Sequence, residues 1–188
     1  MDKNRIMAFT DGIEAIAATI MVLELSVPEH LTLSALLSEW PTFFAYIVSF
    51  ALIYLAWRSH HNAFQKADKI TTPVYLVNGI WLFWSSLVPF ATGLIGSNPA
   101  SALAAGIYVA IIFLWTLTFQ FLDLAILKAN PAAEADEVMT TAGRSIVFGG
   151  FLLAFLAIAV KPLLAVAVLI LSNLVMAGYI MSREKKRY

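Results

Sequence analysis

The stretch SALAAGIYVAIIFLWTLTFQFLDLAIL, residues 101–127, decides the fold. It carries one charged residue, Asp123, and it exceeds the roughly 20 apolar residues that a helix needs to cross a bilayer. A soluble domain of this size could not bury so much apolar surface. The chain is therefore interpreted as an integral membrane protein, and further spans are expected on both sides of this one.

Five other segments have the same apolar character, and prolines lie near their ends, where helices start or stop. The six predicted spans cover residues 7–27, 41–62, 73–96, 101–127, 142–161 and 163–182. No linker, low-complexity run or repeat divides the chain. We therefore expect residues 1–188 to form one all-α transmembrane domain.

Composition supports this class and excludes several others. Of the 188 residues, 61% are hydrophobic and 13% charged, whereas soluble domains are about half apolar and a quarter charged. The formal net charge of zero gives no reason to expect nucleic acid. Cysteine is absent, which rules out disulfides, thiolate metal sites and cysteine nucleophiles. The common catalytic motifs are absent as well, so an enzyme is not expected.

Lysine and arginine fall very unevenly on the two sides of the membrane. With six spans, eleven of the 12 lie on one side and only Lys161 on the other. Basic residues favour the cytoplasm, so both termini are predicted to be cytoplasmic. The start of the chain also resembles a signal peptide, but Asp11, Glu14 and Glu24 within the apolar run argue against cleavage.

The first span has two different faces. On a helical wheel with Ile16 at zero, Asp11 lies near 220° and Glu14 near 160°. The opposite face is a mostly apolar stripe, made of Phe9, Gly12, Ile13, Ile16, Thr19, Ile20 and Leu23. Taken alone, such a stripe is expected to contact lipid or a neighbouring helix.

Polar groups inside spans are costly and usually face protein or water. Asp11, His60 and Asn78 have matching depth, so a buried cluster that joins three helices is expected. A proton-coupled transporter that uses Asp11, Glu14 and His60 is the alternative, although the expectation of unbroken helices weighs against a carrier. His60 and His61 point about 100° apart and make a poor metal pair.

A family signature follows the same residues. RIMAFTDGIEAIAAT, residues 5–19, running to Leu23-Glu24, resembles the first-helix signature of the Transmembrane Protein 175 family of potassium channels: Arg, three residues, Phe-Ser-Asp, then a helix ending near Leu-Glu. Residues 57–60, WRSH, resemble the Trp-x-x-His of its second helix, and Asn78 and Pro89-Phe90 resemble features of its third. Thr10 stands where Ser is usual and keeps the hydroxyl.

This resemblance implies a homotetramer whose first helices line a central potassium-permeable pore without a Thr-Val-Gly-Tyr-Gly filter. The implied constriction rings are Ile16, Ile20 and Leu23, with Thr19 as a hydroxyl layer. The implied clamp on the pore helix consists of Arg5, Phe9, Thr10, Asp11, Trp57, His60 and Asn78. Glu24 would concentrate cations at the outer mouth, although an ordinary rim acid is an equal alternative.

The expected location is a bacterial cell membrane, with further copies of the chain and the lipid bilayer as partners. Potassium is the expected permeant ion, without a cofactor or a resident metal. A membrane protein that transports nothing, such as an assembly factor, remains a second alternative to the channel.

Overall fold

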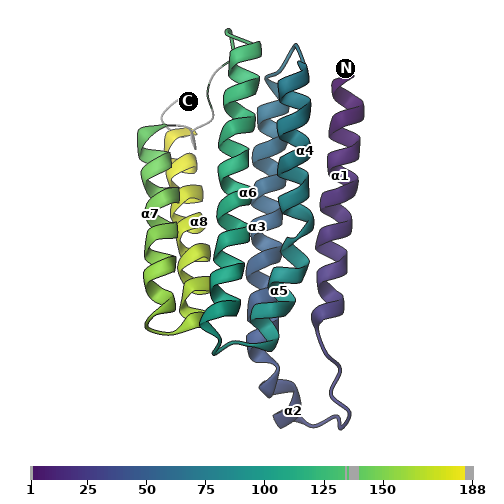
Figure 1. Ribbon diagram of the computed structural model, residues 1–188, viewed down its shortest axis with the longest axis vertical. Helices are drawn as coiled ribbons and strands as arrows, with labels where there is room; N and C mark the ends of the chain where they lie inside the picture. Colours follow the sequence, from purple (N-terminus) through teal and green to yellow (C-terminus); the bar gives the residue numbers. More distant parts are fainter. Residues whose placement is uncertain (1, 134, 136–139, 185–188) are drawn as a thin grey trace.

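The computed structural model describes residues 2–133, 135 and 140–184 as an elongated bundle of helices (Figure 1). The elements are α1 (Lys3–Ile20), the 3-10 turn η1 (Met21–Glu24), α2 (Leu33–Ser38), α3 (Trp40–Gln65), α4 (Thr72–Ser86), α5 (Val88–Ser97), α6 (Ala102–Ala129), α7 (Thr141–Ile158) and α8 (Pro162–Glu184). Within the described residues, six segments are long and apolar enough to cross a bilayer. They are Lys3–Glu24, Trp40–Gln65, Thr72–Ser97, Ala102–Ala129, Thr141–Ile158 and Pro162–Arg183.

These six spans confirm the predicted number, and their ends agree with the predicted ends within four residues. Proline fixes several starts, because its preset backbone angle suits the first turn: α3, α4 and α5 carry one at the first or second position, and α8 begins at Pro162. The largest difference is at α1. This helix begins at Lys3 because the Asp2 side chain accepts a hydrogen bond from the Asn4 backbone N–H at 2.9 Å.

The third span is interrupted at Leu87, which separates α4 from α5. Pro89 explains the break, because it has no N–H to donate and its ring would collide with the carbonyl of Ser85 in a continuous helix. The Leu87 N–H instead bonds to the Trp84 carbonyl at 3.2 Å. The expectation of unbroken helices is therefore wrong at this span.

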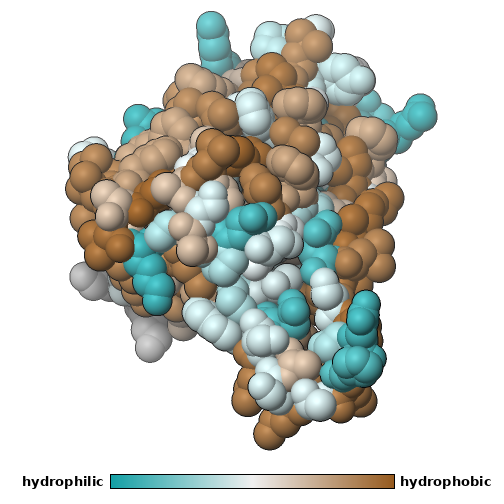
Figure 2. All heavy atoms as spheres, turned by 60° about the horizontal axis from the view of Figure 1, so that its bottom comes forward, coloured by the Kyte–Doolittle hydropathy of each residue, from teal (hydrophilic) through white to brown (hydrophobic). Residues whose placement is uncertain are grey.

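The helices run up and down so that α1 begins and α8 ends at the same end of the bundle (Figure 1). The α3–α4 connection, with Lys66 and Lys69, lies at this basic end, whereas Lys161 lies between α7 and α8 at the other. The short helix α2, which the sequence did not predict, projects from the opposite end and buries none of its residues. Figure 2 shows polar side chains gathered on that end face, with hydrophobic surface around it.

Two edges of the bundle differ in how they are packed. α1 lies at one edge against α3 and α4–α5, while the α7–α8 hairpin lies at the opposite edge and packs mainly on itself (Figure 1). Between them, Trp81, Tyr108, Phe64 and Leu122 are almost fully buried. This leaves α1 with one face on the scaffold and one face outside it.

Candidate functional site

The inner face of α1 meets α4–α5 along a seam with regular spacing. Buried residues on α1 and η1 recur every three or four positions: Ile6, Thr10, Glu14, Ala17 and Met21. Three buried polar residues of the third span, Asn78, Ser85 and Thr92, face this side of the first span. They recur at seven-residue intervals, a spacing that lets side chains of two helices interlock, and each contacts the first span.

The first polar contact joins three spans near the basic end. His60 Nε2 donates to Asn78 Oδ1 at 2.8 Å, and Asn78 Nδ2 donates to Thr10 Oγ1 at 3.4 Å. The His60 ring stacks on Phe64 and Trp81, with centroid distances of 4.3 and 4.7 Å. A buried hydrogen-bond network of this kind stabilises the fold only while every polar group in it has its partner.

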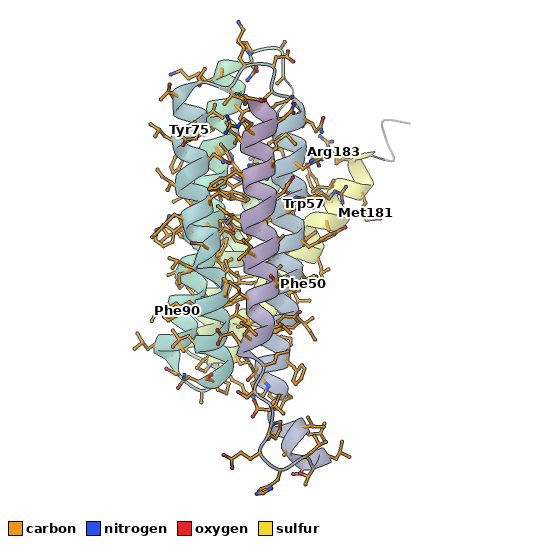
Figure 3. All side chains as sticks on the ribbon, turned by 90° about the vertical axis from the view of Figure 1, so that its right-hand side faces the viewer. Phe50, Trp57, Tyr75, Phe90, Met181 and Arg183 are labelled. Carbon is orange, nitrogen blue, oxygen red and sulfur yellow. The ribbon has the colours of Figure 1, made fainter. Side chains whose placement is uncertain are left out.

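Asp11 does not join this cluster. Its Oδ1 accepts a hydrogen bond at 2.8 Å from Trp57 Nε1, which reaches α1 from α3 (Figure 3). The expected cluster of Asp11, His60 and Asn78 therefore divides into two contacts made by adjacent α1 residues, Thr10 and Asp11. Arg5 and Phe9, the other two residues of the implied clamp, are exposed, with 65% of the Phe9 side chain accessible in the single chain.

The second polar contact lies one turn further along α1. Glu14 is 3% exposed, and its Oε1 accepts a hydrogen bond from Ser85 Oγ at 2.6 Å. Among the described residues, its Oε2 has no hydrogen-bond partner. The sequence placed Glu14 on the same face as Asp11 but gave no partner for it. The seven-residue step from Asn78 to Ser85, one face of a helix, is the signal that points to the partner.

Replacing Ser85 by alanine is expected to destabilise the protein, because both Glu14 oxygens are then buried without a partner. The free energy of unfolding should fall by about 1–3 kcal/mol. The thermal midpoint of the purified protein in detergent measures this change. Ser86→Ala is the matched control, since Ser86 is exposed and its hydroxyl donates to the Phe83 carbonyl of its own helix. Equal midpoints for the two variants would show that the Glu14–Ser85 contact is not stabilising.

The third polar contact lies at the far end of the seam. Thr92 Oγ1 lies 2.7 Å from Ser49 Oγ on α3 and 3.6 Å from Met21 Sδ, and Ser49 in turn lies 2.9 Å from the Tyr108 hydroxyl on α6. The sequence did not predict this network, because isolated hydroxyls in apolar runs are common.

The Glu24 carboxylate lies over Gly93, where any Cβ would overlap it. Because Gly93 has no side chain, the Glu24 carboxylate at the end of η1 can pack directly against it, close to the third polar contact.

The outer face of α1 carries the apolar stripe. Ile16, Ile20 and Leu23 are 58%, 45% and 78% exposed in the single chain. Thr19 lies among them, and its hydroxyl hydrogen bonds to the Ala15 carbonyl at 2.9 Å and the Ile16 carbonyl at 3.0 Å. The hydroxyl proton is thus held by its own helix, which leaves the oxygen lone pairs accessible.

A groove of about 670 Å³ runs beside this stripe, between α1 and α4–α5. Ile16 and Ile20 form one wall, and Phe83 and Phe90 form the other. These four side chains are all exposed. The stripe and the groove share Ile16 and Ile20, and the groove lining is mostly apolar, with Glu24 and Ser86 as polar members.

The three groups of the alternative transporter have separate partners. Asp11 bonds to Trp57, Glu14 to Ser85 and His60 to Asn78. Asp11 and Glu14 lie on α1 and His60 lies on α3, and each is held by a different side chain. Two of these contacts, Asp11–Trp57 and Glu14–Ser85, fix α1 to the scaffold, whereas His60–Asn78 joins α3 to α4 and reaches α1 through Thr10. The other side of α1 is an apolar face.

Comparisons with known proteins connect this arrangement to one family. The family model described as endosomal/lysosomal potassium channel TMEM175 matches residues 5–89, which contain the seam's first two polar contacts. A potassium channel of Chamaesiphon minutus is 34% identical over 147 residues, which cover 73% of this chain and 70% of that protein. A potassium channel of Chryseobacterium sp. (strain P1-3) is 41% identical over 117 residues, 60% of this chain and 61% of that one.

A solved structure resembles the whole bundle. It is the crystal structure of a lysosomal potassium-selective channel TMEM175 homolog from Chamaesiphon minutus, with a TM-score of 0.81 and 30% identity, and it covers 95% of this chain and 97% of that one. The endosomal/lysosomal proton channel TMEM175 of Bos taurus is 34% identical over 137 residues. This chain spans only 28% of the Bos taurus protein and less than two thirds of the Chryseobacterium one.

Six membrane-crossing helices in the arrangement of a solved channel place the chain in the class of multi-pass membrane proteins related to ion channels. The chain belongs to the TMEM175 family and is related to its bacterial members. This confirms the resemblance drawn from the first three helices. The relatives are named as ion channels, and none of their names denotes an enzyme.

Proposed function

We propose that the protein is a potassium-selective channel that conducts passively as a homotetramer, with α1 of each subunit facing a central pore. The observation that carries this proposal is the exposed stripe of Ile16, Ile20 and Leu23 on a helix whose other face is fixed to the scaffold. The names of the bacterial relatives support potassium as the permeant ion. We place the protein in a bacterial inner membrane, with both termini in the cytoplasm because the basic residues lie at that end.

Four copies of α1 around an axis would turn each stripe residue into a ring. Rings of Ile16, Ile20 and Leu23 would narrow the pore and close it by expelling water. The groove beside α4–α5, of about 670 Å³, would receive part of the neighbouring subunit, because its aromatic wall is otherwise exposed. One subunit alone cannot enclose a pore with a single helix.

Selectivity would arise where ions lose water between the apolar rings. Potassium is larger than sodium and holds its hydration shell less strongly, so it crosses an apolar ring more easily. The Thr19 hydroxyl oxygens support this step, because their protons are held by the Ala15 and Ile16 carbonyls and their lone pairs remain accessible. At the outer end, the Glu24 carboxylates would raise the local cation concentration.

The residues of the implied clamp would hold the pore helix in place. Asp11 with Trp57, and Thr10 with Asn78 and His60, tie α1 to α3 and α4 at 2.8–3.4 Å. Arg5 and Phe9 are exposed in the single chain, so in the tetramer their side chains would contact a neighbouring subunit. Opening would then need the first helices to rotate or splay at the rings beyond the clamp.

Proton movement is the second candidate, and Glu14 favours it. A buried carboxyl group with one oxygen lacking a partner among the described residues can exchange a proton, and the Bos taurus relative is named a proton channel. A transporter that couples protons through Asp11, Glu14 and His60 would have to pass them between three separately bonded groups. Glu14→Gln distinguishes proton movement through Glu14 from potassium conduction through the pore. It should abolish proton flux while the rings still conduct potassium.

The test is ion flux in liposomes that contain the purified protein. A potassium gradient should drive flux that does not saturate and does not need a pH gradient, and potassium should pass faster than sodium. Thr19→Ala should lower that preference. Saturating flux that moves protons in proportion would support the transporter, and a folded protein that moves no ion would support a non-transporting role. The subunit count in detergent or lipid tests the tetramer, since a monomer excludes a pore lined by α1.

A further inference from the structure

A second cavity lies on the opposite side of the bundle from the stripe. It has a volume of about 420 Å³ and lies between α3, α6 and the α7–α8 hairpin. The hairpin packs mainly on itself, so it leaves a crevice where it meets α3 and α6. Because α1 and α7–α8 occupy opposite edges, this crevice is remote from the proposed pore (Figure 1).

The crevice runs from the middle of α3 to the basic end of the bundle. Its lining extends along α3 from Leu52 to Lys66, the residue that follows the helix, a distance of about 21 Å over 14 residue steps. Half of a hydrocarbon core is about 15 Å deep. The deep end is apolar, with Leu52, Ile112 and Leu169 in its wall. A lipid acyl chain therefore matches both the depth and the chemistry of this space.

The mouth of the crevice has a different chemistry from its depth. Lys66 is exposed there, and Asn62 and Gln65 add amide groups. These side chains can donate hydrogen bonds to phosphate oxygens, and basic pockets between membrane helices at this level suit anionic headgroups. Acidic side chains are absent from the described residues that line the crevice.

We propose that this crevice binds one anionic phospholipid from the leaflet at the basic end, with an acyl chain between α3, α6 and α8 and the phosphate at Lys66. The lipid would fill the space that separates the α7–α8 hairpin from α3. The proposal rests on the membrane fold and the crevice alone. It holds whether or not α1 lines a pore.

Native mass spectrometry of the purified full-length protein tests the headgroup. The protein is supplied with phosphatidylglycerol and phosphatidylcholine of identical acyl chains, and the lipid retained is counted. Phosphatidylglycerol should be retained preferentially, and Lys66→Gln should weaken its binding about fivefold. Lys69→Gln is the matched control, since Lys69 lies in the same α3–α4 connection and is exposed but does not line the crevice.

A second pair of variants tests the acyl chain. Ala177→Phe on α8 fills the crevice and should abolish retention of phosphatidylglycerol, whereas Val175→Phe adds bulk outside it and should leave retention unchanged. Equal retention of the two lipids, or equal effects at Lys66 and Lys69, would overturn the proposal. If Ala177→Phe fails to fold, the two lysine variants decide alone. Ion flux is not measured, so failure here leaves the channel proposal untouched.

Discussion

Replacing Ile16 and Ile20 together by asparagine is expected to raise resting potassium flux about tenfold, which corresponds to a barrier lowered by about 1.4 kcal/mol. Both side chains lie exposed on the outer face of α1. In the proposed tetramer they form two successive apolar rings, and polar amides would keep water in the pore that those rings expel. Flux of potassium from loaded liposomes measures the effect.

Ile47→Asn is the control for this pair. Ile47 lies on α3 and is 61% exposed, so it has the same chemistry and exposure as the stripe residues without belonging to α1. Its flux should equal that of the unmodified protein. An unchanged flux in the double variant, or the same increase with Ile47→Asn, would show that the stripe does not form the constriction.

Loss of the Asn78 side chain is expected to produce the largest fall in stability among the polar contacts. Asn78→Ala removes the partner of His60 Nε2 and of Thr10 Oγ1 in one step, and all three residues are buried. A buried polar group left without a partner costs about 1–3 kcal/mol. We therefore expect a fall of several kcal/mol in the free energy of unfolding, seen as a lower thermal midpoint and a smaller yield of assembled protein.

Asn98→Ala controls for this change. Asn98 is exposed just after α5, and its side chain donates to the Leu94 carbonyl at 3.1 Å. Its free energy of unfolding should stay within about 0.5 kcal/mol of that of the unmodified protein, as is usual for surface changes, so its thermal midpoint should hardly move. A similar midpoint for both asparagine variants would mean that the His60–Asn78–Thr10 contact does not hold α1.

Most of the fold follows from hydropathy, because a helix that crosses lipid must be apolar over its whole length. That is why the six spans were predicted with ends correct to within four residues. The break at Leu87 was missed although its cause, Pro89, is in the sequence. Membrane helices often tolerate proline, so hydropathy alone does not distinguish a kink from a break. Helix α2 was missed because its six residues are too short to show periodicity.

The sequence predicted which residues share a face of one helix, but not which residues of different helices pair at the candidate site. Helical periodicity placed Asp11 and Glu14 opposite the stripe, matching depth in the membrane supplied His60 and Asn78, and the family resemblance added Trp57 to the clamp. The pairing of Glu14 with Ser85 depends on how two helices pack, and single-sequence periodicity does not contain it. For the same reason Asp11 was assigned to the His60 cluster, whereas the structure gives it to Trp57.

The claim that α1 lines the pore is tested most directly at Leu23. The chain contains no cysteine, so Leu23→Cys provides a single thiol without further changes. Leu23 is the most exposed of the three proposed ring residues. In the proposed orientation it lies at the outer end of the stripe, where a reagent added outside would reach it first. Val175→Cys, on the exposed face of α8, serves as the comparison.

The decisive measurement is potassium flux in liposomes before and after addition of a positively charged, membrane-impermeant thiosulfonate. The account predicts that Leu23→Cys is modified and loses most of its flux, because a bulky cation then occupies the outer ring, while Val175→Cys keeps its flux. A Leu23→Cys protein that is fully modified, as mass spectrometry would show, and that still conducts as before would contradict the account.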